Sequence, residues 1–352
     1  VKTKNFSPNS ATSFQGLRVN GSKIVDEHGR EIRLKGFTLW SNKMISSLYN
    51  GKYTSMDFQR IKSWGLNTVR SEVWYGESLE PYEDQEGVYD DTIIDTIETY
   101  VEMAKEAGLY WIFAVRIQYD DDNPRDWAGW CKASYICTPK GLARYINCVK
   151  WLVQNIESRN WTNLIGYDLW SMPFHGSSPT SSEKQFYYSN VMPSLAGTIR
   201  KYSNKLIFSA LIHQNPNEFS NFKPIPYDVV YGFSFYEYKG MTHGTGPITE
   251  WNYDEQYQID LLKPVVEFKQ KYNAPVYVAE FGVRGDTKPQ ADCLECKLRL
   301  LEDLGANWIY WYYNNAVGTR GFDILYSNNT PKQLILNAIQ KYSRTDYGYV
   351  ES

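Results

Sequence analysis

The 352-residue sequence lacks the features that mark several common classes of protein. No apolar run approaches the roughly 20 residues that cross a bilayer, and residues 1–10 contain no apolar signal core, so we expect a soluble chain, mature or cytosolic, without a membrane partner. No run of lysine and arginine could follow a phosphate backbone, and the formal net charge is -3, which excludes nucleic acid as a partner. A glycine-rich phosphate loop, a histidine-rich metal set and a Ser-His-Asp order are also absent. The sequence therefore predicts no metal and no cofactor.

The five cysteines cannot all pair with one another. Cys131 and Cys137 flank a short loop and could form a disulfide, although two inert thiols are the simpler interpretation. Cys293 and Cys296 form a C-x-x-C at the start of an amphipathic helix. Because no second cysteine pair or histidine cluster accompanies them, we interpret them as a redox-labile or structural pair and not as zinc ligands.

Aromatic residues, in contrast, are abundant. They make up 16% of the chain, with 29 tyrosines and 12 tryptophans, while hydrophobic residues as a whole make up 42%. A core can be built from this composition with many rings left over. The sequence therefore predicts a use for aromatic side chains outside the core, in contact with a ligand.

Short apolar runs alternate with stretches of helical period along the chain. Near-continuous apolar strands joined by helices predict a parallel sheet covered on both faces, and eight such units predict a closed (β/α)₈ barrel. We expect residues 1–352 to form one domain, with the barrel at about 31–342 and an N-terminal β-hairpin at about 17–34 covering one of its ends. The connection that follows His213 has the weakest helical pattern. The strands are expected at residues 32–40, 67–74, 109–117, 164–171, 205–212, 229–236, 275–282 and 306–313.

In such barrels the carboxyl ends of the strands carry the chemistry, because the loops that follow them form the large concavity. Here these ends combine rings, arginine and carboxylate. That mixture suits a neutral polyol, since aromatic faces stack on the C–H faces of sugars while arginine, tyrosine and glutamine bond the hydroxyls. The predicted strand ends carry Trp40, Arg70, Glu72, Arg116, Gln118, Ser171, Met172, His175, His213, Ser234, Tyr236, Glu237, Glu280, Trp311 and Tyr313.

In their order along the chain, these motifs resemble those of clan A glycoside hydrolases, closest to family 5, the cellulases, mannanases and their relatives. The resemblance covers roughly residues 17–342. "PVYVAEFG" resembles the family's E-F-G, which implies that Glu280 is the nucleophile, and "NTVRSEVW" resembles N-x-V-R, which implies that Arg70 holds it. "FSFYEY" and "WIYWYY" resemble the motifs that supply a tyrosine, here Tyr236, and a tryptophan platform, here Trp311.

The same resemblance implies a set of substrate-binding residues. Arg116 aligns with a family histidine and Ser171 with a family asparagine, and "MTHGTG" resembles a T-H-Q-G segment that contains His243. The implied partner is a β-linked oligo- or polysaccharide, bound by a monomer, and a secreted location is favoured over a cytoplasmic one. The implied set is Arg70, Arg116, Ser171, His175, Tyr236, His243, Trp311 and Trp40.

The largest departure from the family pattern is Met172. "GYDLWSMPFHG" resembles W-N-E-P-H-G, so that Met172 occupies the position of the glutamate that acts as acid and base. Retaining hydrolysis needs two carboxyl groups about 5 to 5.5 Å apart, and a thioether has no proton to transfer. Three explanations stay open: a natural loss, an acid from elsewhere, or an inactivating substitution. Candidates for the relocated acid are Glu72, Glu237 and the run Asp120–Asp122, with Glu72 first, although Glu72 is more simply a support for Arg70.

The sequence thus predicts a retaining glycoside hydrolase of the endo-β-1,4-glucanase or β-mannanase type, impaired at its acid. The alternative is a catalytically silent, carbohydrate-binding barrel.

Overall fold

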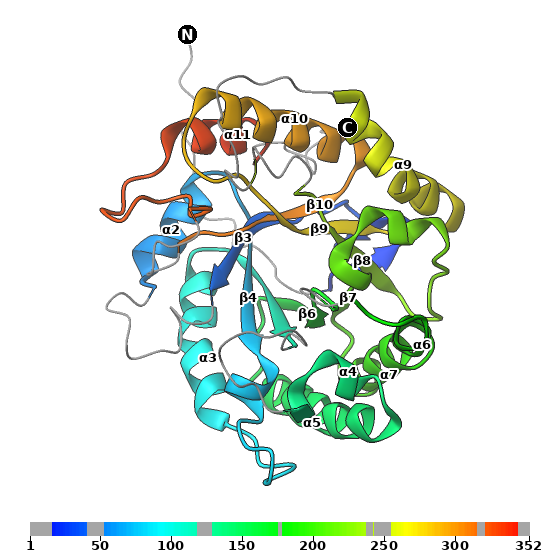
Figure 1. Ribbon diagram of the computed structural model, residues 1–352. Coiled ribbons are helices and arrows are strands. Elements are labelled where there is room, and N and C mark those ends of the chain that lie inside the picture. Colours follow the sequence, from blue (N-terminus) through cyan, green and yellow to red (C-terminus); the bar gives the residue numbers. More distant parts are fainter. Residues whose placement is uncertain are drawn as a thin grey trace.

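Eight parallel strands close into a barrel in the computed structural model of the chain (Figure 1). The structure describes residues 16–40, 53–117, 129–174, 178–236, 242, 255–314 and 321–343. Around the barrel the strands follow the order β10-β3-β4-β5-β6-β7-β8-β9, so neighbours in sequence are neighbours in space. All eight predicted strands are present, and the prediction of a (β/α)₈ barrel is confirmed. Their bounds are β3 (Lys35–Trp40), β4 (Thr68–Trp74), β5 (Tyr110–Arg116), β6 (Leu164–Ser171), β7 (Leu206–Ala210), β8 (Val229–Ser234), β9 (Val276–Phe281) and β10 (Asn307–Tyr310).

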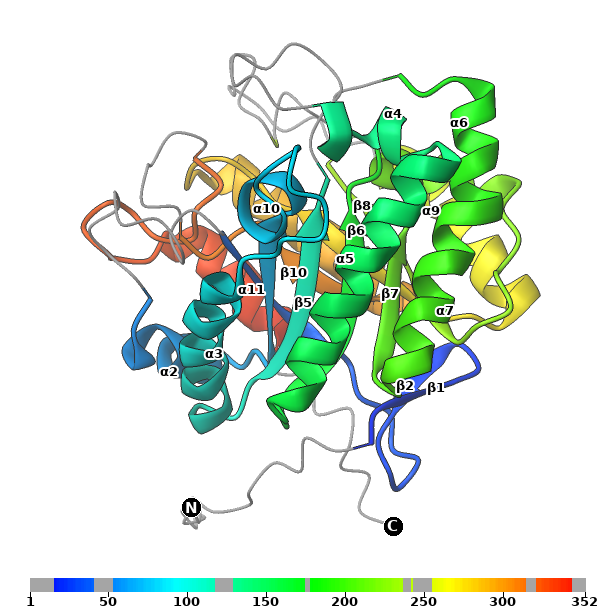
Figure 2. The same ribbon diagram turned by 90° about the horizontal axis from the view of Figure 1, so that it is seen from below.

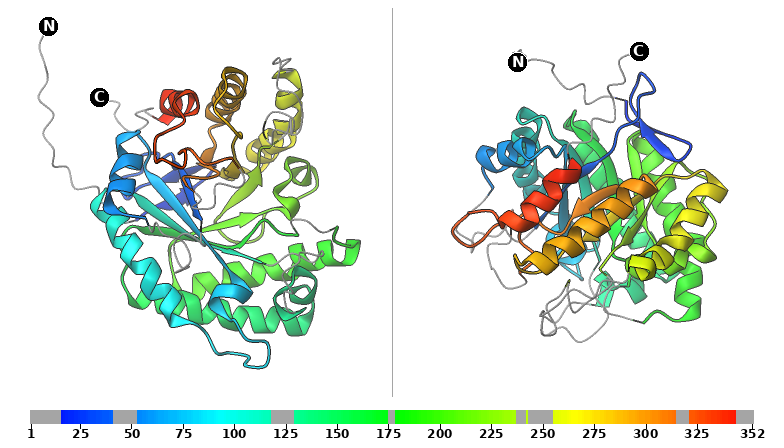
Figure 3. Two further views of the ribbon diagram at one scale, coloured as in Figure 1. Left: turned by 60° about the vertical axis from the view of Figure 1, so that its left-hand side comes forward. Right: turned by 90° about the horizontal axis from the view of Figure 1, so that it is seen from above.

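Helices surround the barrel, and the last three, coloured yellow to red, lie side by side (Figure 3). Local signals set their ends: Thr138 accepts a hydrogen bond from the Gly141 N–H at the start of α5, and Gly305 ends α10 with a φ of 68°. Between β7 and β8 only two short 3₁₀ turns occur, at 212–214 and 216–220, in agreement with the weak helical pattern there. Within the described ranges no helix is long and apolar enough to span a membrane. The helices are α2 (Ser55–Ser63), α3 (Asp91–Glu106), α4 (Ala133–Ile136), α5 (Pro139–Ser158), α6 (Ser181–Phe186), α7 (Met192–Tyr202), α9 (Glu255–Tyr272), α10 (Lys288–Leu304) and α11 (Gln333–Ser343).

The predicted hairpin consists of β1 (Arg18–Asn20) and β2 (Lys23–Val25), paired antiparallel. It lies at one end of the barrel (Figure 2). Leu17, Ile24 and Leu34 pack there in a core cluster with side chains from the first residues of the strands, which places the hairpin at the end where the strands begin. The opposite end, where the strands finish, is therefore left for a site. The barrel side chains of this cluster include Tyr110, Ile112, Ile165, Leu206, Phe208, Val230 and Tyr277.

The five cysteines all carry thiols, so the disulfide considered between Cys131 and Cys137 is not formed. Burial raises the pKa of the Cys293 thiol to about 11. A thiol with so high a pKa is scarcely ionised at neutral pH and reacts slowly, since the thiolate is the reactive form. A structural role therefore suits Cys293 better than a redox-labile one.

Gly36 marks a close approach between neighbouring strands. A Cβ atom there would lie 1.8 Å from the carbonyl oxygen of Thr68 on β4. We expect Gly36→Ala to lower the free energy of unfolding by about 1–3 kcal/mol, because the strands must separate to admit the methyl group. Chemical denaturation measures this change. Gly129→Ala is the matched control, because no atom lies within 4 Å of a Cβ built at Gly129. Equal losses of stability in the two variants would contradict the close packing of Gly36 against β4.

Candidate functional site

Five charged side chains meet inside the barrel toward the carboxyl ends of four strands. We call Arg70, Glu72, Arg116, Asp168 and Glu280 the charged cluster. Arg70 and Glu72 come from β4, Arg116 from β5, Asp168 from β6 and Glu280 from β9. Each is sealed from solvent, with an exposed fraction of 2% or less. Because burying an unpaired charge is costly, the arrangement of these groups has to provide a partner for each.

Arg70 is fully occupied by partners within the barrel. Its Nη2 lies 2.8 Å from Asp168 Oδ2 and donates to Ser171 Oγ at 2.7 Å, while its Nη1 lies 3.0 Å from Glu72 Oε2. The expectation that Glu72 supports Arg70 is therefore met. The prediction that Arg70 contacts Glu280 is wrong, because the N–H groups of Arg70 are directed at the buried carboxylates of Asp168 and Glu72. Arg70 acts on Glu280 only through its charge.

Arg70 and Ser171 are expected from the resemblance to bind substrate, and that role stays a prediction. Both side chains have an exposed fraction of 0%. The Ser171 hydroxyl accepts from Arg70 and donates to Glu72 Oε2 at 2.9 Å, so both of its roles are taken by the protein. Both side chains therefore bond to other members of the buried cluster.

Arg116 is the residue that pairs with Glu280. Its Nη2 donates to Glu280 Oε1 at 2.7 Å, and its Nε lies 2.8 Å from Glu72 Oε1, so one guanidinium bridges two carboxylates. The rings of Trp74 and Trp311 lie against the same guanidinium, with centroids 5.5 Å and 5.2 Å from its central carbon. Such cation–π contacts hold the group in place. Trp311 is 5% exposed, and its role as a sugar platform stays a prediction.

A bulge in β6 sets which of its residues face the interior. Ala114 of β5 pairs with Asp168, but Arg116 pairs with Ser171, so β6 contains one more residue than β5 over this stretch. Asp168 and Ser171 therefore both bond Arg70, although strict alternation would put them on opposite faces. The extra residue aims the last part of β6 at the charged cluster.

A second bulge precedes Glu280. Phe233 of β8 pairs with Val278, whereas Ser234 pairs with Glu280, so β9 also has an extra residue. Burial raises the pKa of Glu280 to about 7; the charge of Arg116 opposes this rise, and that of Glu72 adds to it. At neutral pH a substantial fraction of Glu280 is therefore protonated.

Met172 follows β6 directly and has an unusual backbone. Its φ is 48°, in the left-handed region that non-glycine residues rarely adopt, and Phe174 has a φ of 58°. The Pro173 carbonyl between them accepts a hydrogen bond from the His213 N–H at 2.8 Å, which ties the ends of β6 and β7 together. Strained backbone of this kind clusters at functional sites. The assignment of Met172 to the acid/base position stays a prediction.

Tyr236 lies beside Glu280, as its charge environment indicates. Burial raises the pKa of the Tyr236 hydroxyl well above its usual value, and the charge of Glu280 contributes to the rise. Its ring packs on Phe322, with centroids 5.6 Å apart, and also against the small apolar cluster that contains Trp311. Ser234, the preceding strand end, donates its hydroxyl to the Gln214 side chain.

Several predicted site residues lie outside the part of the chain that the structure describes. These are His175 and His243, the side chain of Trp40, and two candidates for the relocated acid, Glu237 and Asp120–Asp122.

Glu72, the remaining candidate for a relocated acid, is poorly placed for that role. Its two oxygens lie within 3.0 Å of the guanidinium groups of Arg70 and Arg116. Such pairs need the ionised carboxylate, and an ionised carboxylate has no proton to donate. The expectation that Glu72 replaces the missing acid is therefore not supported by the geometry.

Sequence reasoning missed Asp168 and Tyr277. Asp168 is bonded by Arg70 and by the Tyr277 hydroxyl, the latter at 2.6 Å. The sequence "GYDLWS" could have indicated Asp168, because a single carboxylate within an apolar strand is buried and needs a positively charged partner.

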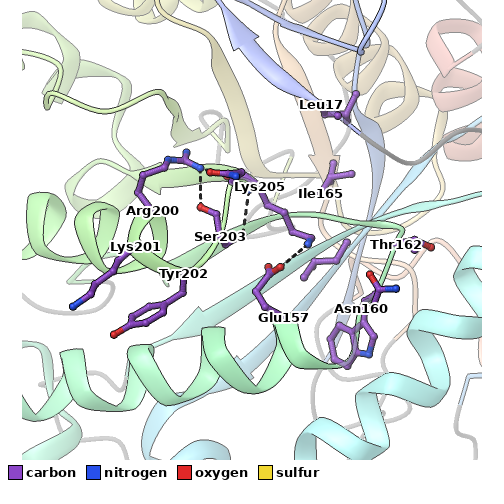
Figure 4. A pocket seen from close by; sticks show the side chains of 14 residues that line it. Leu17, Glu157, Asn160, Thr162, Ile165, Arg200, Lys201, Tyr202, Ser203 and Lys205 are labelled. Carbon is purple, nitrogen blue, oxygen red and sulfur yellow. Dashed lines mark hydrogen bonds and ion pairs between the residues drawn. The ribbon is translucent and has the colours of Figure 1, made fainter.

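A cavity lined by polar side chains lies at the other end of the barrel, where the strands begin. It has a volume of about 520 Å³ and is lined by the ends of α5 and α7 and the first residues of β6. Lys205 and Glu157 form an ion pair there with a 2.9 Å separation, and Arg200 donates to the backbone of Ser203 (Figure 4). None of the charged cluster lines it. Across the described ranges, no group of three or more His, Cys, Asp or Glu side chains is arranged to hold a metal ion.

Sequence comparisons identify relatives of this chain. Residues 25–317 match the sequence profile of the family "Cellulase (glycosyl hydrolase family 5)". An endoglucanase from Clostridium saccharobutylicum is 27% identical over 159 residues, which are 44% of this chain and 33% of that protein. Mannan endo-1,4-beta-mannosidase 3 from Oryza sativa subsp. japonica is 26% identical over 114 residues, 32% of this chain and 24% of that protein. The matches thus span about a third and a quarter of these relatives.

Solved structures share the fold. A broad-specificity endoglucanase of subfamily GH5-4 from Bacteroides salanitronis superposes with a TM-score of 0.75 at 14% identity, over 98% of this chain and 100% of that one. At this identity the likeness concerns the fold alone. The family profile covers most of the chain. The chain belongs to glycoside hydrolase family 5.

Proposed function

We propose that the protein is a retaining glycoside hydrolase of β-1,4-linked glucan or mannan in which Glu280 is the nucleophile and Met172 stands where the acid/base would be. The observation that carries the proposal is the Glu280 carboxylate at the end of β9, held by Arg116 Nη2 at 2.7 Å. An endoglucanase and a mannan endo-1,4-beta-mannosidase among its relatives support this substrate class. The choice between glucan and mannan depends on the loops that follow the strands.

The proposed reaction divides into two steps. The ionised Glu280 attacks the anomeric carbon, the bond to the leaving oxygen breaks, and a glycosyl-enzyme ester forms; water then attacks that carbon and frees the sugar and Glu280. A second carboxyl group normally protonates the leaving oxygen and deprotonates the water. Met172 can do neither, and we expect both steps to be slowed by about 10²- to 10⁴-fold for sugar leaving groups.

An activated substrate tests this proposal, because a nitrophenolate departs without a proton. We expect a dinitrophenyl β-cellobioside or β-mannobioside to form the ester readily, while natural glucan and mannan are hydrolysed slowly. Since only the ionised nucleophile attacks and burial raises the pKa of Glu280 to about 7, the rate of ester formation should rise with pH and level off above about pH 8. The burst of nitrophenolate followed across pH 5–9 measures it. Equal rates on activated and natural substrates would show that an acid is present after all.

A silent sugar-binding barrel is the second candidate. It is favoured by the enclosure of Glu280, which is 2% exposed and already paired with Arg116. In that case cello- or manno-oligosaccharides bind, as titration calorimetry would measure, but the activated glycoside gives no burst at any pH.

A further inference from the structure

We propose that Glu72 is a positioning residue for Glu280: it anchors Arg116 in the bridge between the two carboxylates and adds a third negative charge to the charged cluster. This inference rests on the proposed role of Glu280 as nucleophile. It gives Glu72 a function different from that of a replacement acid.

The charge balance of the cluster is the first step. Two guanidinium groups, Arg70 and Arg116, face three carboxyl groups, Glu72, Asp168 and Glu280. With all five ionised the cluster would carry one uncompensated negative charge, although each member is at most 2% exposed. A buried uncompensated charge is costly, so uptake of one proton is favoured.

The contacts decide which carboxyl group takes that proton. Asp168 accepts hydrogen bonds from Arg70 and from the Tyr277 hydroxyl. Glu72 contacts both guanidinium groups and accepts a hydrogen bond from the Ser171 hydroxyl. Among the described residues Glu280 has one ion-pair partner, Arg116, which it shares with Glu72. It is therefore the least stabilised of the three anions, in agreement with its pKa of about 7.

Geometry makes Glu72 the anchor of the bridge. Arg116 is the last residue of β5 and has a rotamer-rich side chain, yet its Nε is held at 2.8 Å by Glu72 Oε1 while Nη2 reaches Glu280. Trp74 lies two residues after Glu72 on β4 and packs on the same guanidinium, so β4 supplies both the anion and one ring. Within the described part of the chain, the titratable and charged groups that act on Glu280 from the elements around it are Arg70 and Glu72 on β4, Arg116 on β5, Asp168 on β6, Tyr277 on β9 and Tyr236 after β8.

The test measures the ionisation of Glu280 directly in the full-length protein. Carboxyl ¹³C chemical shifts of glutamate-labelled protein are followed from pH 4 to pH 10, and Glu280→Gln identifies the signal. We expect Glu72→Gln to lower the titration midpoint of Glu280 by about one to two units, because the competing anion is gone while a side chain of the same size and shape stays beside Arg116. Arg116→Gln should raise the midpoint by a similar amount, and Glu72→Asp, which keeps the charge, should restore most of the original value.

Glu80→Gln is the matched control. Glu80 is a fully buried glutamate on another ion pair, with Arg144 Nε at 3.0 Å, so its loss removes an equal charge away from the charged cluster. It should leave the Glu280 midpoint in place. An unchanged midpoint in Glu72→Gln, or the same shift in Glu80→Gln, would overturn the inference; if Glu72→Gln does not fold, the opposite shift expected in Arg116→Gln decides.

A second measurement separates this inference from the proposed function. An activated 2-deoxy-2-fluoro-β-cellobioside or -mannobioside should label Glu280 covalently, with a pH profile displaced downward in Glu72→Gln. Absence of label in the unmodified protein at every pH would refute the nucleophile role, whereas the midpoint shifts by NMR would still support or refute the positioning role of Glu72.

Discussion

Replacing Met172 by glutamate is expected to raise hydrolysis of unactivated β-1,4-glucan or β-1,4-mannan by about 10²-fold or more, the scale of general acid–base catalysis. Methionine and glutamate have similar lengths, and Met172 is 8% exposed at the end of β6. A carboxyl group in so buried a place should keep its proton to higher pH than usual, which suits an acid. Reducing-end release from both polysaccharides measures the gain, and the pH profile should become bell-shaped as acid and nucleophile titrate in opposite senses.

Two variants control this experiment. Met172→Gln matches glutamate in shape but has no transferable proton, so it should give no gain. Combining Met172→Glu with Glu280→Ala should abolish the regained activity, because the nucleophile goes with it. If Met172→Glu folds and binds oligosaccharide but hydrolyses neither polymer, the missing acid is not the decisive defect, and the silent binding barrel becomes the better interpretation.

The barrel was predictable because its signals are local and repeated. "LYWIFAVRI" and "PVYVAEFG" are apolar along their whole length, as strands covered on both faces must be, and the amphipathic segments between such strands give the helices. The same reasoning placed Glu280 and Arg116 at strand ends, where the structure finds them. Strand alternation also correctly linked Glu72 with Arg70, two residues apart on β4.

The pairing of charged groups within the site was harder to predict, because it depends on the register of neighbouring strands and on how far long side chains extend. The bulge in β6, which turns both Asp168 and Ser171 toward Arg70, has no sequence signal that periodicity could detect. Because Arg70 is bonded to Asp168, Arg116 is the arginine that contacts Glu280. A comparison of motifs pairs one arginine with one glutamate and therefore cannot predict that a different arginine makes the contact. Long side chains make such substitutions possible because a guanidinium can bridge two acids.

Arg70→Met is the stability change with the largest expected effect: a loss of about 3–5 kcal/mol in the free energy of unfolding. Methionine fills much of the same volume, but it leaves Asp168 and Glu72 as buried carboxylates without their shared cation. Denaturant unfolding at pH 8 measures the loss. The matched control is Arg159→Met, which also removes two ion pairs, to Asp95 and Glu98, but at the surface, where a loss of at most about 1 kcal/mol is expected.

The pH dependence of the Arg70→Met defect identifies its cause. In the unmodified protein burial already raises the pKa of Asp168, and the charge of Arg70 opposes that rise, so removing Arg70 raises the pKa further in the folded state. The folded variant then binds a proton that the unfolded chain has released, and its stability falls as pH rises above the unfolded value of about 3.9. The defect should therefore be smaller at pH 5 than at pH 8, and Arg70→Met combined with Asp168→Asn should recover part of the loss. A defect that is equal at both pH values and unrelieved in the double variant would point to lost packing around β4 and β6, and would remove the electrostatic role assigned to Arg70.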